Sequence, residues 1–484
     1  MEKTSPAGKD HVEFCTTANK AFNEMGTIEP KGDYSGASQK TDPVEIRLVR
    51  KLDMRIMPIL WAMYSLNYLD RNALPQARLN NLEDDLNLKG VEYNTAISIL
   101  FVGYILMQVP SNMFLTRTKP RIYLPVVMMA WATVSACTAL VQNYPGRVAC
   151  RFLLGFVEAP FYPGALYLLS IFYTRKELAS RIAIMYTGQV LSTGCSGLIA
   201  AACFATLDGA HGIAGWRWLF IIEGVTTFGV ALIGIFLLCD DPADTRWLTE
   251  EERALAVSRI KRDTVGDEGR ASVWSGLRQA ATDPKLWVFV LMQNLHLSAC
   301  SFNNFFPTIV ASLGFKSKIT ALLLTAPPYF VSGLLGVPFA WSSGRFNERT
   351  WHITGGFGLA VIGFAMSCAS MNNAVRYTST FLYATGAYSV GSVILGWVSA
   401  TLSQTPEKKS VSYAIVNSFA NLSYVYMAYL WPTSDSPRYI TGFSAMLAFS
   451  VGSILCAWVM RFWLVSMNKT IKRNENEHRV LYAF

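Results

Sequence analysis

An arginine and a glutamate lie within one long apolar part of the chain. The segment RFLLGFVEAPFYPG, residues 151–164, contains Arg151 and Glu158, and the runs 131–140 and 165–172 on either side contain no charged residue. A spacing of seven places the two side chains on one face of a helix. Burial favours the protonated form of a carboxyl group, and a nearby cation favours the ionised form. The pair therefore has the chemistry of a protonatable switch; the alternative is a static ion pair that fixes helix packing.

A second arginine follows an aspartate near the end of the first apolar run. The stretch SLNYLDRNALP contains Asp70 and Arg71. In one interpretation the two are a helix-end pair whose long side chain reaches the membrane interface. In the other, Arg71 points into a transport path and attracts an anion, because a guanidinium binds carboxylates well.

Uncharged polar residues form a third group of candidates. In QNLHLSACSFNNFFP, His296 and Asn303 are seven apart and share one helix face, with Asn294 earlier in the same run. Gln108 and Asn417 lie in two other apolar runs. All five are candidates for hydrogen bonds to a substrate. The alternative is that they pack internally or join one helix to another.

The elements that carry these residues are predicted from composition. The chain is 52% hydrophobic and 15% charged, whereas a soluble globular protein is about 25% charged. A bilayer core needs roughly 17–25 apolar residues per helix, and backbone groups in lipid must pair internally. Twelve runs meet this requirement, approximately at 56–74, 95–115, 122–141, 148–172, 182–206, 217–238, 285–311, 319–341, 352–370, 377–399, 411–431 and 440–463.

The longest charged interruption divides these runs into six and six. It contains DDPADTRWLTEEERALAVSRIKRD, in which Glu250–Arg262 is predicted to be a helix with Thr249 as its N-cap. The arrangement predicts an all-α integral membrane protein of twelve transmembrane helices in two six-helix bundles around a central path. The predicted parts are a cytosolic tail 1–50, a first bundle 51–238, a cytosolic loop 239–284, a second bundle 285–465 and a cytosolic tail 466–484.

Basic residues indicate the orientation in the membrane. With a cytosolic N-terminus, the inner loops contain 18 Lys or Arg and the outer loops contain 8. The positive-inside rule therefore predicts that both termini are cytosolic. Residues 1–50 contain no apolar core of a signal peptide and have the composition of a disordered tail. The basic amphipathic stretch 44–57 is predicted to lie along the inner membrane surface.

Several functional classes are disfavoured. The net charge of +9 reflects membrane topology, so no nucleic-acid partner is expected. No GxxxxGK[ST] loop occurs, which argues against an ATP-driven pump. The nine cysteines include no CxxC, so neither a metal site nor a disulfide framework is indicated. No set of nucleophile, base and orienting group is found, and we expect neither an enzyme nor a cofactor.

The motifs resemble those of a known transporter group. RFLLGFVEAPFYPG resembles the fourth-helix signature of the major facilitator superfamily, with Arg151 and Gly155 in its RxxxG positions. More narrowly, the chain is similar to the fungal allantoate-permease branch of the anion:cation symporter family. The stretches that carry this similarity are NYLDRNAL, VPSNMFLTRTKPR, NNFFPTIVASLGF, LLLTAPPYF and SQTPEKKSVSYAIVNSFANLSYVYMAYLWPTSDSPRYITGFS.

The resemblance implies import of small organic anions with protons across the fungal plasma membrane. It also implies anion binding and proton coupling by Arg71, Arg151 and Glu158, which occupy the matching positions. Two departures concern the inner gate: TRTKPR, residues 116–121, lacks an acidic residue, and Gly344 stands where relatives usually have aspartate.

The sequence therefore predicts a proton-coupled importer of a small carboxylate or similar anion that works by alternating access. Arg71 would attract the anion and Glu158 would carry the proton, with Arg151 tuning that exchange. The contacts from the opposite bundle would come from Asn294, His296 and Asn303. The alternatives are an exporter of a fungal secondary metabolite and a low-flux nutrient sensor. The expected partners are an anionic small molecule, protons and the lipid bilayer; the sequence does not determine the oligomeric state.

Overall fold

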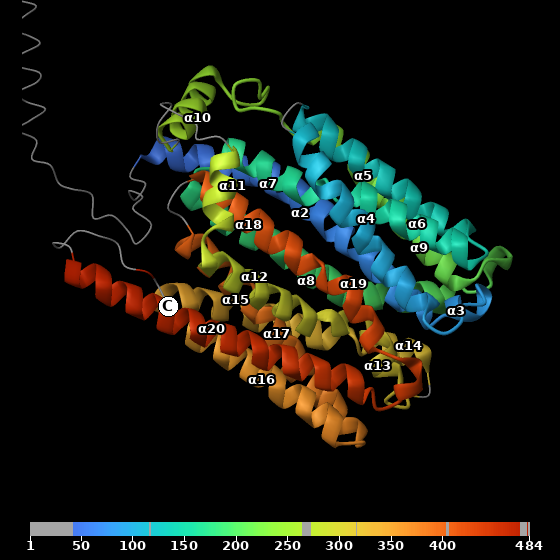
Figure 1. Cartoon of the computed structure of the whole chain (residues 1–484). Coiled ribbons are helices and arrows are strands. Elements are labelled where there is room, and N and C mark those ends of the chain that lie inside the picture. Colours follow the sequence, from blue (N-terminus) through green and yellow to red (C-terminus); the bar gives the residue numbers. More distant parts are fainter. Residues whose placement is uncertain are drawn as a thin grey trace, which may run out of the picture. The chain divides into compact units, whose positions relative to one another are not determined.

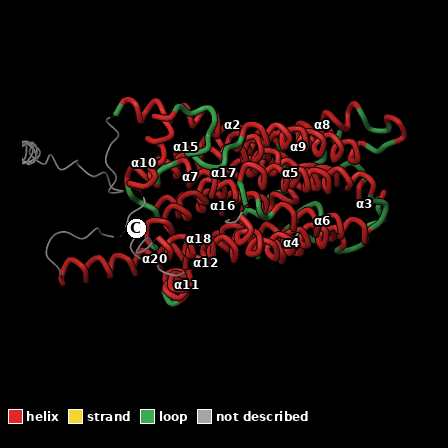
Figure 2. Tube along the Cα trace, turned by 90° about the horizontal axis from the view of Figure 1, so that it is seen from above, coloured by secondary structure: helices red, strands yellow, loops and turns green. Residues whose placement is uncertain are grey.

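The computed structural model describes residues 42–115, 118–263, 273–315, 317–402, 406–474 and 482. The chain divides into two compact units, Met1–Lys51 and Leu52–Phe484, and the packing described below is that of the second unit. Its described secondary structure consists of helices joined by turns and loops, without a strand (Figure 2). The predicted all-α class is confirmed.

Each apolar run predicted in the first half coincides with helix. In chain order these helices are α2 (Pro43–Arg78), α4 (Glu92–Leu115), α5 (Pro120–Cys137), α6 (Tyr144–Glu158) with α7 (Phe161–Phe172), α8 (Arg175–Thr206) and α9 (Gly215–Leu237). A short helix, α3 (Leu82–Asp85), follows α2. Helix α2 runs past the predicted end of the first span, so Asp70 and Arg71 lie inside it and not at its end.

The second half follows the same pattern with more interruptions. Its helices are α12 (Pro284–Ala299) with η4 (Ser301–Phe305) and α13 (Phe306–Ala311), α14 (Lys318–Leu323) with α15 (Ala326–Phe346), α16 (Thr350–Ala369), α17 (Asn373–Thr401), α18 (Pro406–Asn421) with α19 (Ser423–Met427) and η5 (Ala428–Leu430), and α20 (Ile440–Asn474). Within the described residues, eight helical segments are long and apolar enough to cross a membrane by length and composition. The other four predicted spans coincide with α2, α4, α12 with α13, and α18 with α19.

The helices pack as two bundles that meet along two seams. In the first bundle α4 packs on α6, and α5 packs on α6 and α9; in the second, α17 packs on α15 and α16, and α20 on α12 and α16. The bundles meet where α8 contacts α14 and α15, and where α4 contacts α18 and α19. Helices α10 and α11 lie at one end of this unit, and α3, α13 and α14 lie at the other (Figure 1).

The loop helix forms as its sequence predicts. Helix α10 spans Glu250–Asp263 and begins with three glutamates. Thr249 Oγ1 accepts a hydrogen bond from the Glu252 backbone N–H at 3.2 Å, and the Glu252 carboxylate accepts one from the Thr249 N–H at 2.9 Å. This reciprocal pair satisfies two backbone donors that a helix start leaves free, and the predicted N-cap is confirmed. A second short helix, α11 (Val273–Ala281), follows in the loop.

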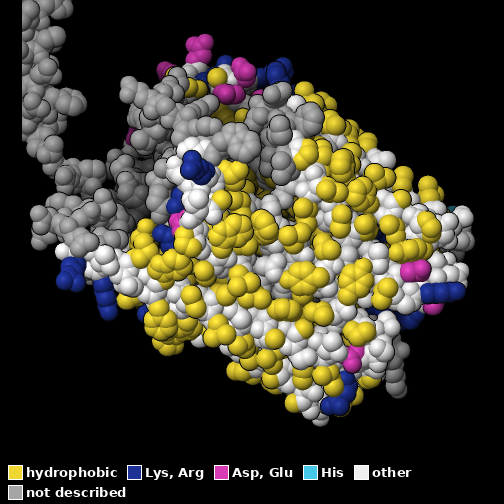
Figure 3. Space-filling view, in the orientation of Figure 1, with side chains coloured by type: hydrophobic (Ala, Val, Ile, Leu, Met, Phe, Trp, Pro, Cys, Tyr) yellow, Lys and Arg dark blue, Asp and Glu magenta, His cyan; other side chains and the backbone are white. Residues whose placement is uncertain are grey.

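On the face shown in Figure 3, the described surface is apolar across the middle of the unit and charged toward its ends. Large apolar side chains such as Phe236, Trp341, Leu455 and Phe462 are each more than 60% exposed. In water such exposure would be unfavourable, but against lipid chains it has no such penalty. The distribution supports a membrane-embedded middle with charged ends in water.

Glycines allow α4 and α6 to approach closely. A Cβ at Gly155 would lie 1.9 Å from the Leu100 carbonyl oxygen, and one at Gly103 would lie 2.3 Å from the Phe152 carbonyl oxygen. Both obstacles are backbone atoms, so a side chain at either position forces the helices apart. Packing therefore explains why Gly155 occupies the glycine position of RxxxG, because no larger residue fits there.

Gly155→Ala is expected to lower the free energy of unfolding of the purified protein by about 1–3 kcal/mol, the usual cost of overpacking, and so to lower its melting temperature. The control is Gly229→Ala in α9, where a Cβ would meet nothing within 4 Å. That change should be neutral or slightly stabilising, because alanine favours a helix by about 0.5–1 kcal/mol over glycine. Equal melting temperatures for the two variants in detergent would refute the packing explanation.

Candidate functional site

Glu158 lies where the predicted fourth span is interrupted. It is the last residue of α6, and α7 begins three residues later, after Pro160. Proline has no N–H and resists continuation of the preceding helix, which explains the break between the two. The Glu158 side chain is 1% exposed. A carboxyl group at this depth needs a partner or a proton.

The partner is Arg71 of α2. Its Nε donates to Glu158 Oε1 at 2.8 Å, and Asn67 Nδ2 donates a second short hydrogen bond to the same oxygen. Glu158 Oε2 has no hydrogen-bond partner among the described residues. Asn67 and Arg71 are four apart and share a face of α2. Together with Glu158, they are called the central ion-pair cluster below.

Two tyrosine rings flank the Arg71 guanidinium. Its Cζ atom lies 5.5 Å from the centre of the Tyr68 ring and 4.8 Å from that of Tyr104 on α4. Such contacts stabilise a cation by about 0.5–2 kcal/mol, more when the group is desolvated. The Arg71 side chain is 17% exposed, so its guanidinium is held in place but not sealed off. This combination suits a group that must meet an anion.

Asp70 belongs to a different environment, although it adjoins Arg71 in the sequence. Its side chain is buried and accepts hydrogen bonds from Trp131 Nε1 at 3.0 Å, Ser135 Oγ at 3.3 Å and Thr227 Oγ1 at 3.3 Å. These donors come from α5 and α9. Asp70 and Arg71 therefore do not form the helix-end pair considered above, in which a long side chain reaches the membrane interface. Arg71 points to α6, and Asp70 points into the bundle.

The charged side chains of Arg151, Arg147 and Glu223 are also buried within the first bundle. Arg151 interacts electrostatically with Glu158 and Asp70, and its Nη2 has no hydrogen-bond partner among the described residues. Arg147 stacks its guanidinium 5.0 Å from the Phe220 ring centre, and none of its three side-chain nitrogens has a partner there either. Both oxygens of Glu223 are likewise without partners in the described part. The direct ion-pair partner of Glu158 is thus Arg71, whereas Arg151 acts on it at longer range.

Asp70 and Glu223 are two buried carboxylates that interact electrostatically. Replacing each by its amide should change the stability of the protein differently. Asp70→Asn replaces an acceptor oxygen by an NH₂ group that opposes the donors around it, so a loss of about 1–3 kcal/mol is expected. Glu223→Gln removes a buried charge that no donor satisfies and should leave stability unchanged or raised. Melting curves of the purified variants measure both. A larger loss for Glu223→Gln than for Asp70→Asn would contradict this assignment.

Asn303, from the second bundle, reaches the first. Its Nδ2 donates to Asn72 Oδ1 at 3.1 Å, and its Oδ1 accepts a bond from the Tyr329 hydroxyl at 2.6 Å. Asn72 lies on α2, one residue beyond Arg71. Asn303 therefore joins the second bundle to α2, the helix that carries Arg71.

His296 lies instead inside the second bundle. It is buried, its Nε2 lies 3.1 Å from the Ala387 carbonyl oxygen, and a Cβ at Gly391 would approach its ring to 2.9 Å. Both contacts are with α17. The surroundings are those of a packing residue that joins two helices, and the shared face with Asn303 is lost because the helix breaks at Cys300.

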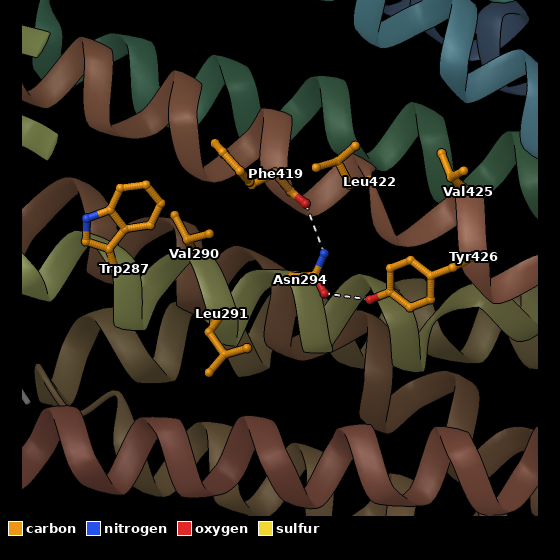
Figure 4. A pocket seen from close by; sticks show the side chains of 8 residues that line it. All are labelled: Trp287, Val290, Leu291, Asn294, Phe419, Leu422, Val425 and Tyr426. Carbon is orange, nitrogen blue, oxygen red and sulfur yellow. Dashed lines mark hydrogen bonds between the residues drawn. The ribbon is translucent and has the colours of Figure 1, made fainter.

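Asn294 lines a groove of about 580 Å³ between α12 and α18–α19 (Figure 4). Its Nδ2 donates to the Phe419 carbonyl oxygen at 2.9 Å, and its Oδ1 accepts from the Tyr426 hydroxyl at 2.7 Å. The rest of the lining is apolar and includes exposed Trp287 and Leu291. The structure therefore places Asn294 on a lateral groove and away from the contacts of Arg71 and Glu158.

Gln108 lies on the seam between α4 and α18, whereas Asn417 lies in α18 and its described hydrogen bond stays within that helix. Gln108 is buried, and its Oε1 accepts a bond from Ser418 Oγ at 3.2 Å. Asn417 is half-buried, and its backbone oxygen accepts a bond from Asn421. Gln108 thus joins the two bundles in this structure.

Polar bridges between the bundles gather at the end where α3 and α14 lie (Figure 1). Lys318 Nζ donates to Asn81 Oδ1 at 2.8 Å, and Ser98 Oγ donates to the Val425 carbonyl oxygen at 2.8 Å. The hydroxyls of Thr95 and Tyr429 are 3.1 Å apart. Together with the Asn72–Asn303 bond, these contacts hold the bundles together at this end.

The inner-gate motifs are only partly described. Residues 116 and 117 of TRTKPR lie outside the described residues. Gly344 lies in α15, and a Cβ there would meet nothing within 4 Å. Packing therefore does not impose glycine at this position.

Sequence reasoning missed the partners that define the site. Asn67 stands one helical turn before Arg71, a spacing that could have indicated a shared ligand. Tyr104 and the donors to Asp70 come from other helices and gave no such signal. In the described part of the chain, no group of three or more His, Cys, Asp or Glu residues could hold a metal ion.

The chain resembles transporters along most of its length. A family model for the Major Facilitator Superfamily matches residues 60–428. The uncharacterized transporter C11D3.18C of Schizosaccharomyces pombe is 30% identical over 470 residues, which cover 96% of this chain and 93% of that protein. The MFS transporter prlL of a fungal strain is 32% identical over 391 residues, covering 79% and 78%. The major facilitator-type transporter hxnP of Emericella nidulans is 30% identical over 450 residues, covering 91% and 90%.

Solved structures share the fold at low sequence identity. A bacterial homolog of the human lysosomal transporter Spinster, in an inward-facing and unoccupied conformation, has a TM-score of 0.67 and 15% identity, covering 86% of this chain and 96% of that one. A D-xylose-proton symporter has a TM-score of 0.64 and 16% identity, covering 84% and 97%. The predicted all-α fold of the major facilitator superfamily is confirmed, and the chain belongs to this superfamily.

Proposed function

We propose that this transporter imports a small organic anion together with protons by alternating access. The observation that carries the proposal is the buried ion pair of Arg71 and Glu158. In this pair, Arg71 and Asn67 both donate hydrogen bonds to the same oxygen of the Glu158 carboxylate. It supplies an anion-binding guanidinium and a protonatable group that depend on each other. The motif resemblance to the fungal allantoate-permease branch supports a carboxylate, a vitamin or an allantoate-like compound as the substrate.

Competition for Arg71 couples the two ligands. A substrate carboxylate binds a guanidinium best through two parallel hydrogen bonds. As it draws Arg71 away, Glu158 is left buried with Asn67 as its remaining donor. An ionised carboxylate in that position is costly, so Glu158 takes up a proton. Anion and proton are thus loaded together, and loss of the proton restores the ion pair and expels the anion.

The bundles supply the movement. We assign the end with α3 and α14 to the outside of the cell, in accord with the positive-inside count, and both termini to the cytosol of a plasma-membrane protein. The bridges from Asn81, Asn72 and Ser98 then close the outer side. Breaking them and forming new contacts at the inner side would expose the cluster to the acidic exterior. Arg151, behind Glu158, would favour release of the proton after the switch.

Uptake of labelled acids in yeast without its own carriers tests the proposal. The panel is allantoate, nicotinate, pantothenate, a dipeptide and sulfate, each measured at acid and neutral outer pH. We expect at least one to accumulate, faster at acid pH and not after addition of a protonophore. With the protein confirmed at the cell surface, accumulation of none would contradict import and favour export or sensing. Accumulation that ignores pH and the protonophore would contradict proton coupling.

A further inference from the structure

Arg147 lies inside the first bundle, four residues after Asn143, the N-cap of α6. Its exposed fraction is 0%. None of its three side-chain nitrogens has a hydrogen-bond partner among the described residues. An arginine keeps its charge in proteins and offers five N–H donors. Within the described part of the chain, the donors of this buried cation are therefore all unused.

The neighbouring titratable groups do not balance its charge. The groups that interact electrostatically with Arg147 are Arg151, Tyr93 and Cys150. Arg151 follows one helical turn later on the same face of α6 and carries the same charge. Tyrosine and cysteine side chains are largely neutral at pH 7. None of these three side chains therefore supplies a negative charge to Arg147.

The buried acids of the bundle serve other groups. Glu158 is paired with Arg71, and Asp70 accepts hydrogen bonds from three side chains of α5 and α9. Glu223 interacts electrostatically with Asp70 and with the other buried arginine of α6. The counter-charge for Arg147 is therefore not one of these three carboxylates.

The surroundings of Arg147 favour an anion. It lies in the first turn of α6, where the helix dipole favours negative charge and disfavours a cation. The Phe220 ring of α9 covers one side of the guanidinium at 5.0 Å, but an aromatic face offsets only part of the desolvation of a buried charge. On α4, which packs on α6, the buried Tyr93 hydroxyl is a further donor without a partner in the described residues.

We infer that Arg147 binds a small monovalent anion, of which chloride is the simplest, inside the first bundle. One negative charge balances one guanidinium, and a spherical ion accepts N–H bonds from several directions. Water would satisfy the donors but would leave the charge unbalanced. Sulfate and phosphate fit less well, because the guanidinium has no exposed surface and a second charge is costly to bury. The inference goes beyond the proposed function and does not depend on it, since the anion is a structural ligand apart from Arg71.

Chloride binding to the full-length protein, purified in detergent, tests the inference. The protein is exchanged into gluconate buffer and titrated with radioactive chloride at constant ionic strength, with binding followed by scintillation proximity. Melting temperatures are recorded over the same titration. We expect saturable binding and a melting temperature that rises with occupancy, because a ligand that binds only the folded state stabilises it. Bromide should displace the labelled chloride, whereas sulfate at the same concentration should not.

Variants identify the residue responsible. Arg147→Met removes the charge and keeps an unbranched side chain, so saturable chloride binding and the chloride-dependent rise in melting temperature should both be lost. The matched control is Arg217→Met in α9. Arg217 also stacks on an aromatic ring, 4.4 Å from the centre of Trp216, but its Nη1 donates to the Ala139 carbonyl oxygen. Because that guanidinium already has a partner, its loss should leave chloride affinity unchanged.

A second substitution protects the test against misfolding. Arg147→Lys keeps the charge but offers fewer donors, so it should bind chloride several-fold more weakly than the wild-type protein. If Arg147→Met does not fold, as judged by its size-exclusion profile, Arg147→Lys decides: weaker binding supports the inference, and unchanged affinity overturns it.

Three further results would also overturn the inference. The first is the absence of saturable chloride binding in the wild-type protein. The second is full chloride binding in a folded Arg147→Met variant, which would place the ion elsewhere. The third is displacement of chloride by sulfate at equal concentration, which would contradict a small monovalent ligand. Substrate uptake is measured separately, so the proposed function stands or falls on its own result.

Discussion

Glu158→Gln is expected to abolish proton-driven accumulation of the substrate while leaving one-for-one exchange of substrate across the membrane. Glutamine keeps an oxygen that accepts bonds from Arg71 and Asn67, so the local geometry is preserved. It cannot gain or lose a proton, so the carrier can no longer use the proton gradient. Exchange requires only movement of the loaded carrier, which resembles the neutral state that glutamine mimics.

Uptake and counterflow in reconstituted vesicles separate these two activities. The expected result is loss of pH-driven accumulation to the level of empty vesicles, with counterflow retained within a few-fold. Glu223→Gln is the control, because it neutralises another buried carboxylate of the same bundle. Among the described residues, the Glu223 carboxylate has no hydrogen bond to Arg71. Accumulation that survives in Glu158→Gln would exclude this residue as the proton carrier. Loss in both variants would indicate a general effect of bundle charge.

Arg71→Ala is expected to reduce substrate affinity at least about 100-fold. Removal of one partner of a buried, hydrogen-bonded charge pair typically costs about 2–5 kcal/mol, and here it removes the proposed anion ligand as well. The same change leaves Glu158 buried without its cation. A lower melting temperature is therefore also expected, because an uncompensated buried charge destabilises the fold.

The double variant Arg71→Ala with Glu158→Gln distinguishes the two effects. It should recover much of the stability, because no unpaired charge remains, but none of the affinity, because the guanidinium is still absent. Arg71→Lys should bind weakly, since an ammonium lacks the planar fork of a guanidinium. Arg78→Ala is the control; Arg78, at the end of α2, pairs with Glu83 of α3, and its loss should change substrate affinity little. Full affinity in Arg71→Ala would refute its role.

The sequence alone determined the class of the fold. Twelve apolar runs of bilayer length, divided by one charged loop, leave few alternatives, because lipid offers no partners for free backbone groups. The N-cap at Thr249 followed from residue types and spacing within a single turn. Local chemistry and the solvent of the helices sufficed for both. The same reasoning selected Glu158 and Arg71 as residues of interest, because buried charge is costly wherever the helix packs.

Only the tertiary structure decided which residues meet. The seven-residue spacing placed Arg151 and Glu158 on one face, yet the partner of Glu158 is Arg71, from a helix 87 positions away in sequence. The spacing rule also failed for His296 and Asn303, because it assumes one continuous helix, whereas the chain breaks between them. The Asn294 side chain has the donor and acceptor groups of a ligand-binding residue, but it lies on a lateral groove. Periodicity fixes the face of a helix, but the crossing of helices fixes the neighbour, and that crossing depends on packing between residues far apart in the chain, such as Gly155 against Leu100.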